Sequence, residues 1–174
     1  MFGKKVYLRA LEPSDLELLY QWENDISVWD VSDAVAPYSR FTLEQFIQSI
    51  SQDIYAAKQL RLMINDTHTH QTVGIIDVFD IDPIHLRAGI GILIAQEYRQ
   101  QGYAAEALQL TMEHLFMRLH LHQLYCNILS SNEASLKLFT NAGFVIAGLK
   151  KEWHLGQTGF EDEYLLQKIN LLVI

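Results

Sequence analysis

The chain has 174 residues, of which 49% are hydrophobic and 20% are charged, so one globular domain is expected. The single cysteine excludes an internal disulfide and any Cys-x-x-Cys metal site, and no metal is expected. The 13 basic and 21 acidic residues give a net charge of −8, which excludes nucleic acid as the expected partner and favours cationic ones such as polyamines or basic peptides, although solubility alone also explains this sign.

The first third of the chain predicts one strand and two helices. Residues 5–10 have the pattern of a strand, and Pro13 opens a helix that ends near Glu23. A second helix is expected to start at Thr42, where Gln45 would complete a capping box. The apolar stripe of this second helix is Phe46, Ile47, Ile50 and Ile54.

The segment between the two helices is irregular and rich in aromatic and acidic residues, among them Trp29, Asp30, Asp33 and Tyr38. Together with Trp22, its aromatic residues suit either the wall of a binding site for an amine or ordinary core packing.

Strands follow in the middle of the chain. Residues 60–65 and 72–79 predict a hairpin around a polar turn, with a break at residues 80–83. Residues 88–94 are almost all apolar, which is typical of a central strand covered on both faces. Gly89 and Gly91 within that strand indicate a bulge or a close approach of another group to the backbone.

The pattern then alternates between helix and strand. A helix is expected over residues 102–118 and a strand over 123–129. Asn132 caps a short helix that ends at Ala142, and residues 144–155 and 160–170 form a closing hairpin. The whole predicts a mixed α/β fold, with an antiparallel front half, a central βαβ unit and a hairpin at the back.

The start of the long helix has the composition of an anion site. No Ser, Thr, Asp or Asn occurs from Ala95 to Ala107, so the usual N-cap residues are absent. Bare N–H groups and the positive end of the helix favour an anion, and Arg99 adds a full charge. Gly102 and Ala104 keep the loop slim, so a pyrophosphate fits it, although a water-capped helix is the alternative.

Three stretches resemble one known family. The run Arg99-x-x-Gly102-x-Ala104 is similar to the pyrophosphate-binding motif of the GCN5-related N-acetyltransferases (GNAT). Residues 132–144, with Asn132, Ser135, Phe139 and the Gly-Phe pair at the end, resemble the family's second block. Residues 6–16 are similar to the opening of the branch that holds spermidine acetyltransferases and ribosomal-protein alanine acetyltransferases.

The resemblance implies that residues 1–174 form a single acetyl-CoA-binding N-acetyltransferase domain. The sheet would have about seven largely antiparallel strands with a splayed cleft, surrounded by four helices. The pantetheine arm of acetyl-CoA would enter this cleft, and Gly89 or Gly91 would supply the bulge that opens it. The implied cofactor-binding residues are Ile92, Leu93 and Ile94 along the strand, Arg99, Gln100, Gln101, Gly102, Tyr103, Ala104 and Ala105 at the loop, and Asn132, Lys137 and Phe139 on the far side. Each of the last three has a simpler alternative, namely N-capping, solvation and core packing.

The implied reaction is direct attack of an amine on the thioester in a ternary complex, with a backbone N–H near Ile94 holding the oxyanion. Asp77 is the first candidate for the general base because its strand would border the acceptor side, and Glu163 and His154 are second choices. Many family members carry a tyrosine where this chain has Phe139, which cannot donate a proton. Ser135 is the substitute candidate for the general acid, although it also suits a helix start and the thiolate may leave unaided.

The acceptor stays open between a small amine such as a polyamine and a protein N-terminus or lysine. Spermidine-acetylating members often carry a glutamate where this chain has Gly89-Ile90-Gly91, which lowers the support for a polyamine. Because Phe139 lacks the hydroxyl, a non-catalytic acyl-CoA-binding or sensing module is the alternative function.

The surroundings of the protein follow from simpler features. No apolar run approaches the ~18 residues of a membrane helix, and the first residues lack the apolar core of a signal peptide. We therefore expect no membrane partner and a cytoplasmic location, where Cys126 would stay reduced. The apolar end of the chain, residues 171–174, suits either its own sheet or a neighbouring subunit, so a homo-oligomer remains open.

Overall fold

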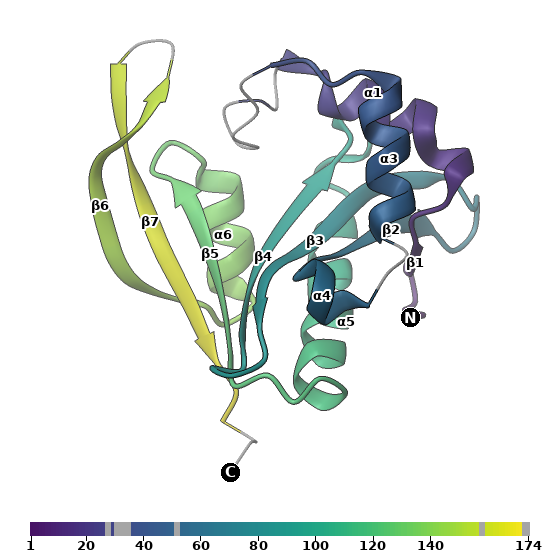
Figure 1. Ribbon diagram of the computed structural model, residues 1–174. Helices are drawn as coiled ribbons and strands as arrows, with labels where there is room; N and C mark the ends of the chain where they lie inside the picture. Colours follow the sequence, from purple (N-terminus) through teal and green to yellow (C-terminus); the bar gives the residue numbers. More distant parts are fainter. Residues whose placement is uncertain (27–28, 30–35, 51–52, 157–158, 172–174) are drawn as a thin grey trace.

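The computed structural model describes residues 1–26, 29, 36–50, 53–156 and 159–171. These residues form one seven-stranded sheet in the order β1-β2-β3-β4-β5-β7-β6 (Figure 1). The strands are β1 (Val6–Ala10), β2 (Leu60–Asp66), β3 (Thr72–Asp82), β4 (Arg87–Ile94), β5 (Gln123–Leu129), β6 (Val145–Gly156) and β7 (Gly159–Ile169). Neighbouring strands are antiparallel except β4 and β5, which are parallel and are the two strands of the central βαβ unit. This arrangement confirms the mixed α/β fold predicted from the sequence.

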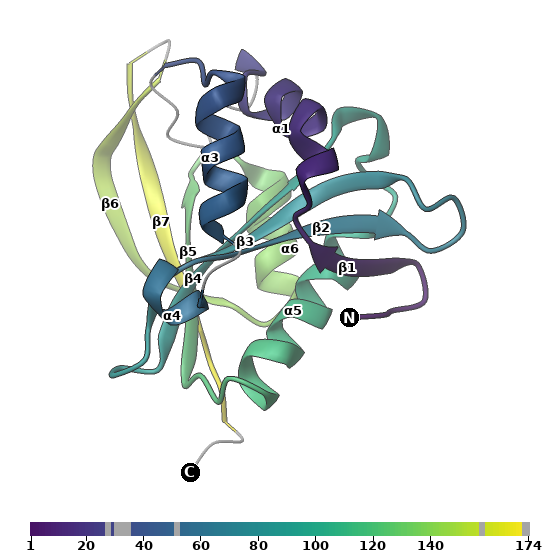
Figure 2. The same ribbon diagram turned by 45° about the vertical axis from the view of Figure 1, so that its right-hand side comes forward.

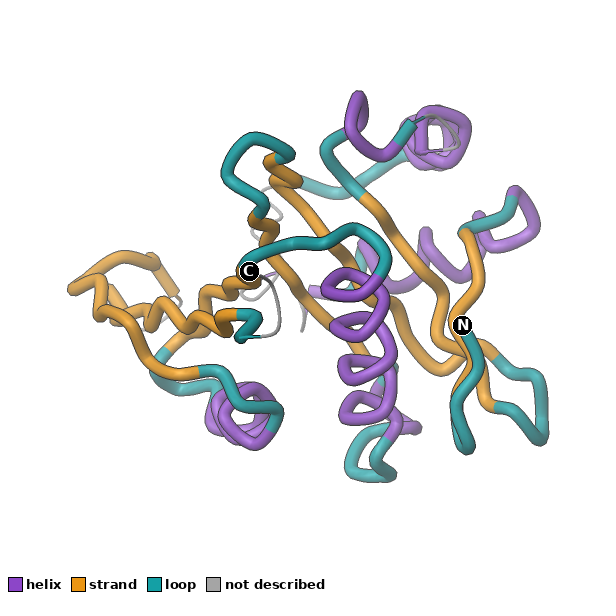
Figure 3. Tube along the Cα trace, turned by 90° about the horizontal axis from the view of Figure 1, so that it is seen from below, coloured by secondary structure: helices purple, strands orange, loops and turns teal. Residues whose placement is uncertain are grey.

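Helices cover both faces of the sheet (Figures 2 and 3). They are α1 (Leu16–Glu23), α3 (Arg40–Ile50), the short α4 (Ile54–Ala57), α5 (Tyr103–Met117) and α6 (Glu133–Asn141). Short 3-10 turns at Pro13–Asp15 and Gln96–Tyr98 precede α1 and α5. In the view from below, α5 and α6 lie on one side of the strands (Figure 3).

Alternation along the strands divides the core into two layers. On β2 and β3, Ile64 and Ile76 belong to the main apolar cluster with Leu108 and Leu115 of α5. Their neighbours point to the opposite face, because successive side chains of a strand alternate. There Met63 and Ile75 pack with residues of α1 and α3, namely Leu19, Leu43 and Ile47. The face that carries α1 and α3 is the one on which the binding cavity lies.

Three local predictions were wrong. The second helix starts at Arg40 instead of Thr42, because the Ser39 hydroxyl accepts a hydrogen bond from the Thr42 N–H (3.1 Å) and caps the helix. Ile54 does not continue this helix but opens α4, where the Asp53 side chain accepts from the Tyr55 N–H. Strand β3 runs to Asp82, past the break predicted at residue 80.

Some positions singled out from the sequence lie outside the described residues, namely Asp30, Asp33 and residues 172–174.

No helix in the described part of the chain is long and apolar enough to cross a membrane. In the same residues, no group of three or more His, Cys, Asp or Glu side chains gathers in a way that could hold a metal ion.

Candidate active site

The two central strands separate partway along their length. The parallel pairing of β4 with β5 covers only Arg87, Ala88 and Gly89, opposite Gln123, Leu124 and Tyr125. Beyond this point β4 stays paired with β3 as far as Ile94, while β5 stays paired with β7 as far as Leu129 (Figure 1). The segment from Ile90 to Ile94 therefore presents one backbone edge to the opening, where an extended ligand can pair with it as an added strand.

The glycines of β4 do not form the predicted bulge. The β3–β4 register runs without a shift through Gly91 and Gly89, and the irregularity lies beyond them, between Phe79 and Asp82. A Cβ atom added to Gly89 would lie 2.1 Å from the ring of Phe79. Glycine is required here by the close approach of this ring, which was the other option that the sequence left open.

The N-terminus of α5 carries no side-chain cap. Its N-cap residue is Gly102, with a φ of 85°, and Gln100 also has a left-handed backbone with a φ of 59°. A Cβ on Gly102 would meet nothing within 4 Å, so the backbone conformation and not crowding selects glycine, and the space in front of the loop is open. Uncapped amides at the positive end of a helix fit an anionic group such as a diphosphate.

Neighbouring groups hold this loop in place. The Arg99 Nε donates to the Ile94 carbonyl (3.0 Å), and the exposed guanidinium stays beside the loop. Tyr103 donates its hydroxyl to Asp66 (2.7 Å), and Lys5 donates to the Gln101 carbonyl. The carboxylate of Glu106, in the first turn of α5, accepts from the backbone N–H groups of residues 4–6 and so turns away from the helix start.

The predicted residues of α6 take mostly structural positions. Asn132 is the N-cap, and its side chain accepts from the Ser135 N–H (3.1 Å). Phe139 is buried and packs edge to face on Phe144, with ring centroids 5.1 Å apart. Lys137 is exposed and Ser135 is half-buried.

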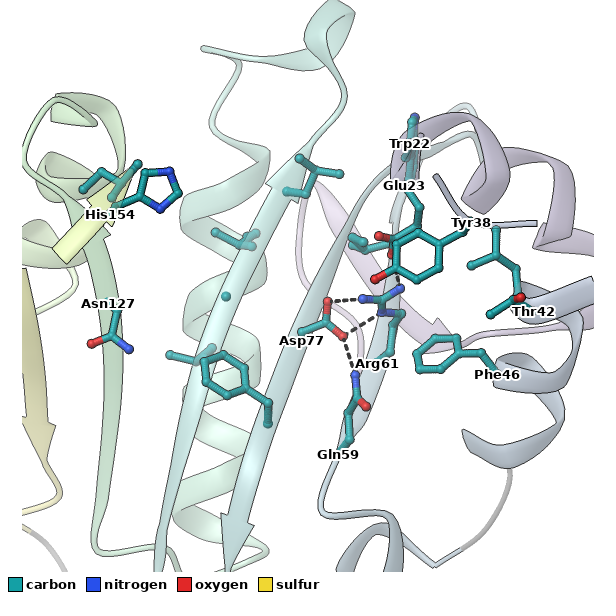
Figure 4. Close-up of a pocket in the computed structure, with 18 of the residues that line it drawn as sticks. Trp22, Glu23, Tyr38, Thr42, Phe46, Gln59, Arg61, Asp77, Asn127 and His154 are labelled. Carbon is teal, nitrogen blue, oxygen red and sulfur yellow. Dashed lines mark hydrogen bonds and ion pairs between the residues drawn. The ribbon is translucent and has the colours of Figure 1, made fainter. Parts of the chain in front are cut away.

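A cavity of about 600 Å³ opens on the face of the sheet that carries α1 and α3. One wall comes from α1, α3, β2 and β3, the other from β5, β6 and β7, and β4 lies between them (Figure 4). Asp77, Ile92, Leu93, His154 and Glu163 all line it, so the structure brings together the three candidate bases and two of the three strand residues. The aromatic residues Trp22 and Tyr38 line the same cavity, whereas Trp29 donates its indole N–H to the Glu23 carbonyl.

Arg61 connects two carboxylates on one wall of the cavity. Its Nε and Nη2 donate to the two oxygens of Asp77 (2.7 and 2.9 Å), and Nη1 donates to Glu23 (2.5 Å). Burial lowers the pKa of Arg61, but the charges and hydrogen bonds of Asp77 and Glu23 outweigh it and hold the pKa above its ordinary value. Two carboxylates share this one guanidinium, so the group leaves an excess negative charge beside the cavity.

The opposite wall carries a second set of polar groups. Glu163 on β7 pairs with Lys150 of β6 (2.5 Å), and Asn127 and His154 face the cavity from β5 and β6 (Figure 4). His154 lies opposite Glu161 in the β6–β7 register. Hydrogen bonds from Ser131 hold the pKa of Glu161 below its ordinary value, so this carboxylate stays charged beside the histidine.

A model of the acetyltransferase (GNAT) domain matches residues 5–145 of the chain. The chain belongs to the GNAT acetyltransferase family. It is therefore an acetyl-CoA-dependent N-acetyltransferase, as the three sequence motifs predicted.

Among its relatives are spermidine N(1)-acetyltransferases. That of Vibrio cholerae is 26% identical over 149 residues, which cover 84% of this chain and 82% of the relative. That of Escherichia coli is 28% identical over 146 residues, 82% of this chain and 74% of the relative. The crystal structure of the Vibrio cholerae spermidine N-acetyltransferase with CoA and spermine matches 96% of both chains with a TM-score of 0.87 at 24% identity, which establishes the fold.

Proposed function

We propose that this enzyme acetylates a primary amino group of a small cationic amine of the polyamine class. The observation that carries the proposal is the position of the cavity: it lies at the separation of β4 and β5, directly beside the edge of the strand that leads to the uncapped start of α5. One opening can thus receive a thioester and an amine together, and such placement alone accounts for a large part of the rate in bimolecular transfers.

The acetyl donor would bind along β4. We propose that the amides of Gly102, Tyr103, Ala104 and Ala105, with Gln100, Gln101 and the guanidinium of Arg99, hold the diphosphate. The pantetheine arm would pair with the open edge at Ile92, Leu93 and Ile94, and the amide near Ile94 would hold the oxyanion. Asn132 and Lys137 would border the arm from α6, while Phe139 contributes packing.

The charge of the cavity wall and the names of related enzymes support a polyamine as the acceptor. Glu23 and Asp77 share a single cation, Arg61, so an excess negative charge faces the cavity and attracts an ammonium group. Trp22, Tyr38 and Phe46 supply aromatic faces, which bind cations and methylene chains alike. The Vibrio cholerae and Escherichia coli relatives are named for spermidine, and a Vibrio cholerae structure at 25% identity is described as dodecameric. A homo-oligomer is therefore part of the proposal.

The proton steps are assigned to residues near this opening. We infer that Asp77, whose two oxygens accept hydrogen bonds from Arg61, orients the ammonium group and takes one of its protons, so that the neutral nitrogen can then attack the thioester carbon. As the C–S bond breaks, the nitrogen loses its second proton, and Ser135, at the first turn of α6, is the proposed relay that gives its hydroxyl proton to the departing thiolate and takes up this second proton. These two residues are the catalytic candidates, and neither role depends on Phe139.

A thiol-release screen tests the function. The purified protein is mixed with acetyl-CoA and a panel of polyamines, amino acids, aminoglycosides and short peptides, and free CoA is measured with a thiol reagent. Burial raises the pKa of Cys126 to about 12, so the protein's own thiol adds little background. We expect release to be fastest with polyamines. Tight acetyl-CoA binding without thiol release from any amine would contradict the proposal and indicate a non-catalytic module.

A further inference from the structure

An aromatic ring occupies the base of the cavity. Asp77 and Phe79 lie on the same face of β3, opposite Gly91 and Gly89 of β4. The Phe79 ring lies over both glycines: added Cβ atoms would be 2.1 Å from its Cε2 at Gly89 and 3.8 Å from its Cε1 at Gly91. The ring therefore fills the space that side chains of β4 would otherwise take.

A second ring supports Phe79 at the point where the strands separate. Tyr125, the last β5 residue paired with β4, packs edge to face on Phe79 with ring centroids 5.9 Å apart. The Tyr125 hydroxyl donates to Asp80 (3.0 Å), which fixes the tyrosine from the other side. Phe79 is thus held over β4 and against Tyr125 of β5, and it closes the narrow end of the opening on the cavity face.

The charged groups of the cavity lie away from this narrow end. Asp77 precedes Phe79 by two residues on β3, and its partners Arg61 and Gln59 come from the neighbouring β2 side. In Figure 4 these polar side chains gather on one wall, and His154 and Asn127 lie on the other. Phe79 gives this end an apolar surface, and the amide side chains of Gln59 and Asn127 border it, so the end can receive the methylene chain of a diamine together with its distal ammonium group.

We propose that Phe79 sets the depth of the acceptor cavity and thereby limits the chain length of the amine that the enzyme accepts. The proposal rests on the proposed function, because it takes this cavity as the acceptor site. An amine whose chain is too long for the space in front of Phe79 cannot place its nitrogen at the thioester. Removing the ring extends the cavity over Gly89 and Gly91, and each methylene that becomes buried there strengthens binding about fourfold.

The test compares linear α,ω-diamines, from diaminopropane to diaminooctane, as acceptors for the wild-type enzyme and for Phe79→Ala. We measure kcat/KM at saturating acetyl-CoA. We expect the best chain to become longer in the variant and kcat/KM for the longest diamines to rise about tenfold. Phe116→Ala is the matched control, because Phe116 is a half-buried ring that packs on the α5 side of the core and does not line the cavity.

Two outcomes separate the depth proposal from the proposed function. If kcat/KM depends on diamine length in the same way in Phe79→Ala as in the wild type, the depth proposal is wrong, while the proposed amine acetylation still stands. If the wild type acetylates none of the diamines, the proposed function is wrong for diamines. The depth proposal is then tested by calorimetric titration of the same diamines into the wild type and into Phe79→Ala. Absence of binding, or unchanged length preference in binding, overturns the proposal as well.

Gly89→Ala provides a second variant that leaves the ring present. The added methyl group must push the Phe79 ring toward the cavity, so we expect shorter diamines to be preferred. In the double variant Gly89→Ala, Phe79→Ala, the added methyl group occupies space that the ring has left. This variant should therefore prefer long diamines, as Phe79→Ala alone is expected to do. If Gly89→Ala shifts the preferred diamine length equally in the presence and absence of the Phe79 ring, the contact between Gly89 and Phe79 does not control the length, and the proposal is wrong.

Discussion

At the scale of single residues, some side chains that line the cavity were predicted from the sequence and others were not. Asp77 was proposed because its strand would border the acceptor side of the cleft, and its side chain does line the cavity. Its partner Arg61 was missed, because the register that places it opposite Asp77 includes a shift between Ile64 and Asn65, which the turn between β2 and β3 does not set. Phe79 was missed for another reason: its contact with Gly89 depends on a ring rotamer, which no spacing of residues encodes. Both contacts of these two residues, the Arg61–Asp77 pair and the Phe79–Gly89 contact, therefore require the structure.

The role of Asp77 can be tested by removing its charge. Asp77→Asn keeps the shape of the side chain and one acceptor for Arg61, but it cannot take a proton from the amine. We expect kcat to fall about 100-fold, with the largest loss at lower pH, where more of the amine is protonated. The measurement is the pH profile of kcat for the best acceptor found in the screen.

Glu163→Gln is the comparison for this variant, because it removes the same charge from the opposite wall of the cavity. A pH profile that is unchanged in Asp77→Asn but altered in Glu163→Gln would transfer the role of general base to Glu163.

At the scale of elements, the start of α5 was the most predictable part of the site. Its uncapped N-terminus follows from the absence of capping residues, and Gly102 has the left-handed conformation that glycine permits. What the sequence did not disclose is how the loop is fixed: Tyr103 bonds to Asp66 at the end of β2 and Glu106 bonds to the N-terminal segment. These bonds join segments far apart in the chain, so local patterns do not contain them.

The Tyr103–Asp66 hydrogen bond should stabilise the fold in a pH-dependent way. Hydrogen bonds from the Thr69 backbone and from the Tyr103 hydroxyl hold the pKa of Asp66 well below its ordinary value. The stability that this depressed pKa provides is full above about pH 4, the unfolded pKa of aspartate, and is lost as the pH falls toward the folded value.

Tyr103→Phe should therefore lower the free energy of unfolding by about 1 kcal/mol at neutral pH, and the difference should shrink in acid. Urea unfolding of both proteins over a range of pH measures it. Tyr125→Phe is the control, since it removes a tyrosine–aspartate bond at the other end of the sheet. A Tyr103→Phe effect that stays constant into acid would show that the bond does not involve the charged form of Asp66.

At the scale of the whole molecule, three distant parts of the chain meet at one opening. The N-terminal half supplies Glu23 and Arg61, the centre supplies β4, and the closing hairpin supplies His154 and Glu163. The family resemblance covers these parts in order, and the fold it implied is confirmed. The arrangement of the cavity wall that carries Arg61 and Asp77 could not be predicted from the sequence, because it is set by how α1 and α3 pack over β2 and β3.

The uncapped start of α5 is the proposed binding site for the diphosphate of the acetyl donor. The most direct measurement is calorimetric titration of acetyl-CoA into Arg99→Glu, with Arg118→Glu as control, since that variant reverses the same charge at the opposite end of α5. We expect Arg99→Glu to weaken binding at least about tenfold, through lost pairing with the phosphates and added repulsion, while Arg118→Glu stays near the wild type. Equal affinity of all three proteins would contradict the claim and would place the diphosphate elsewhere.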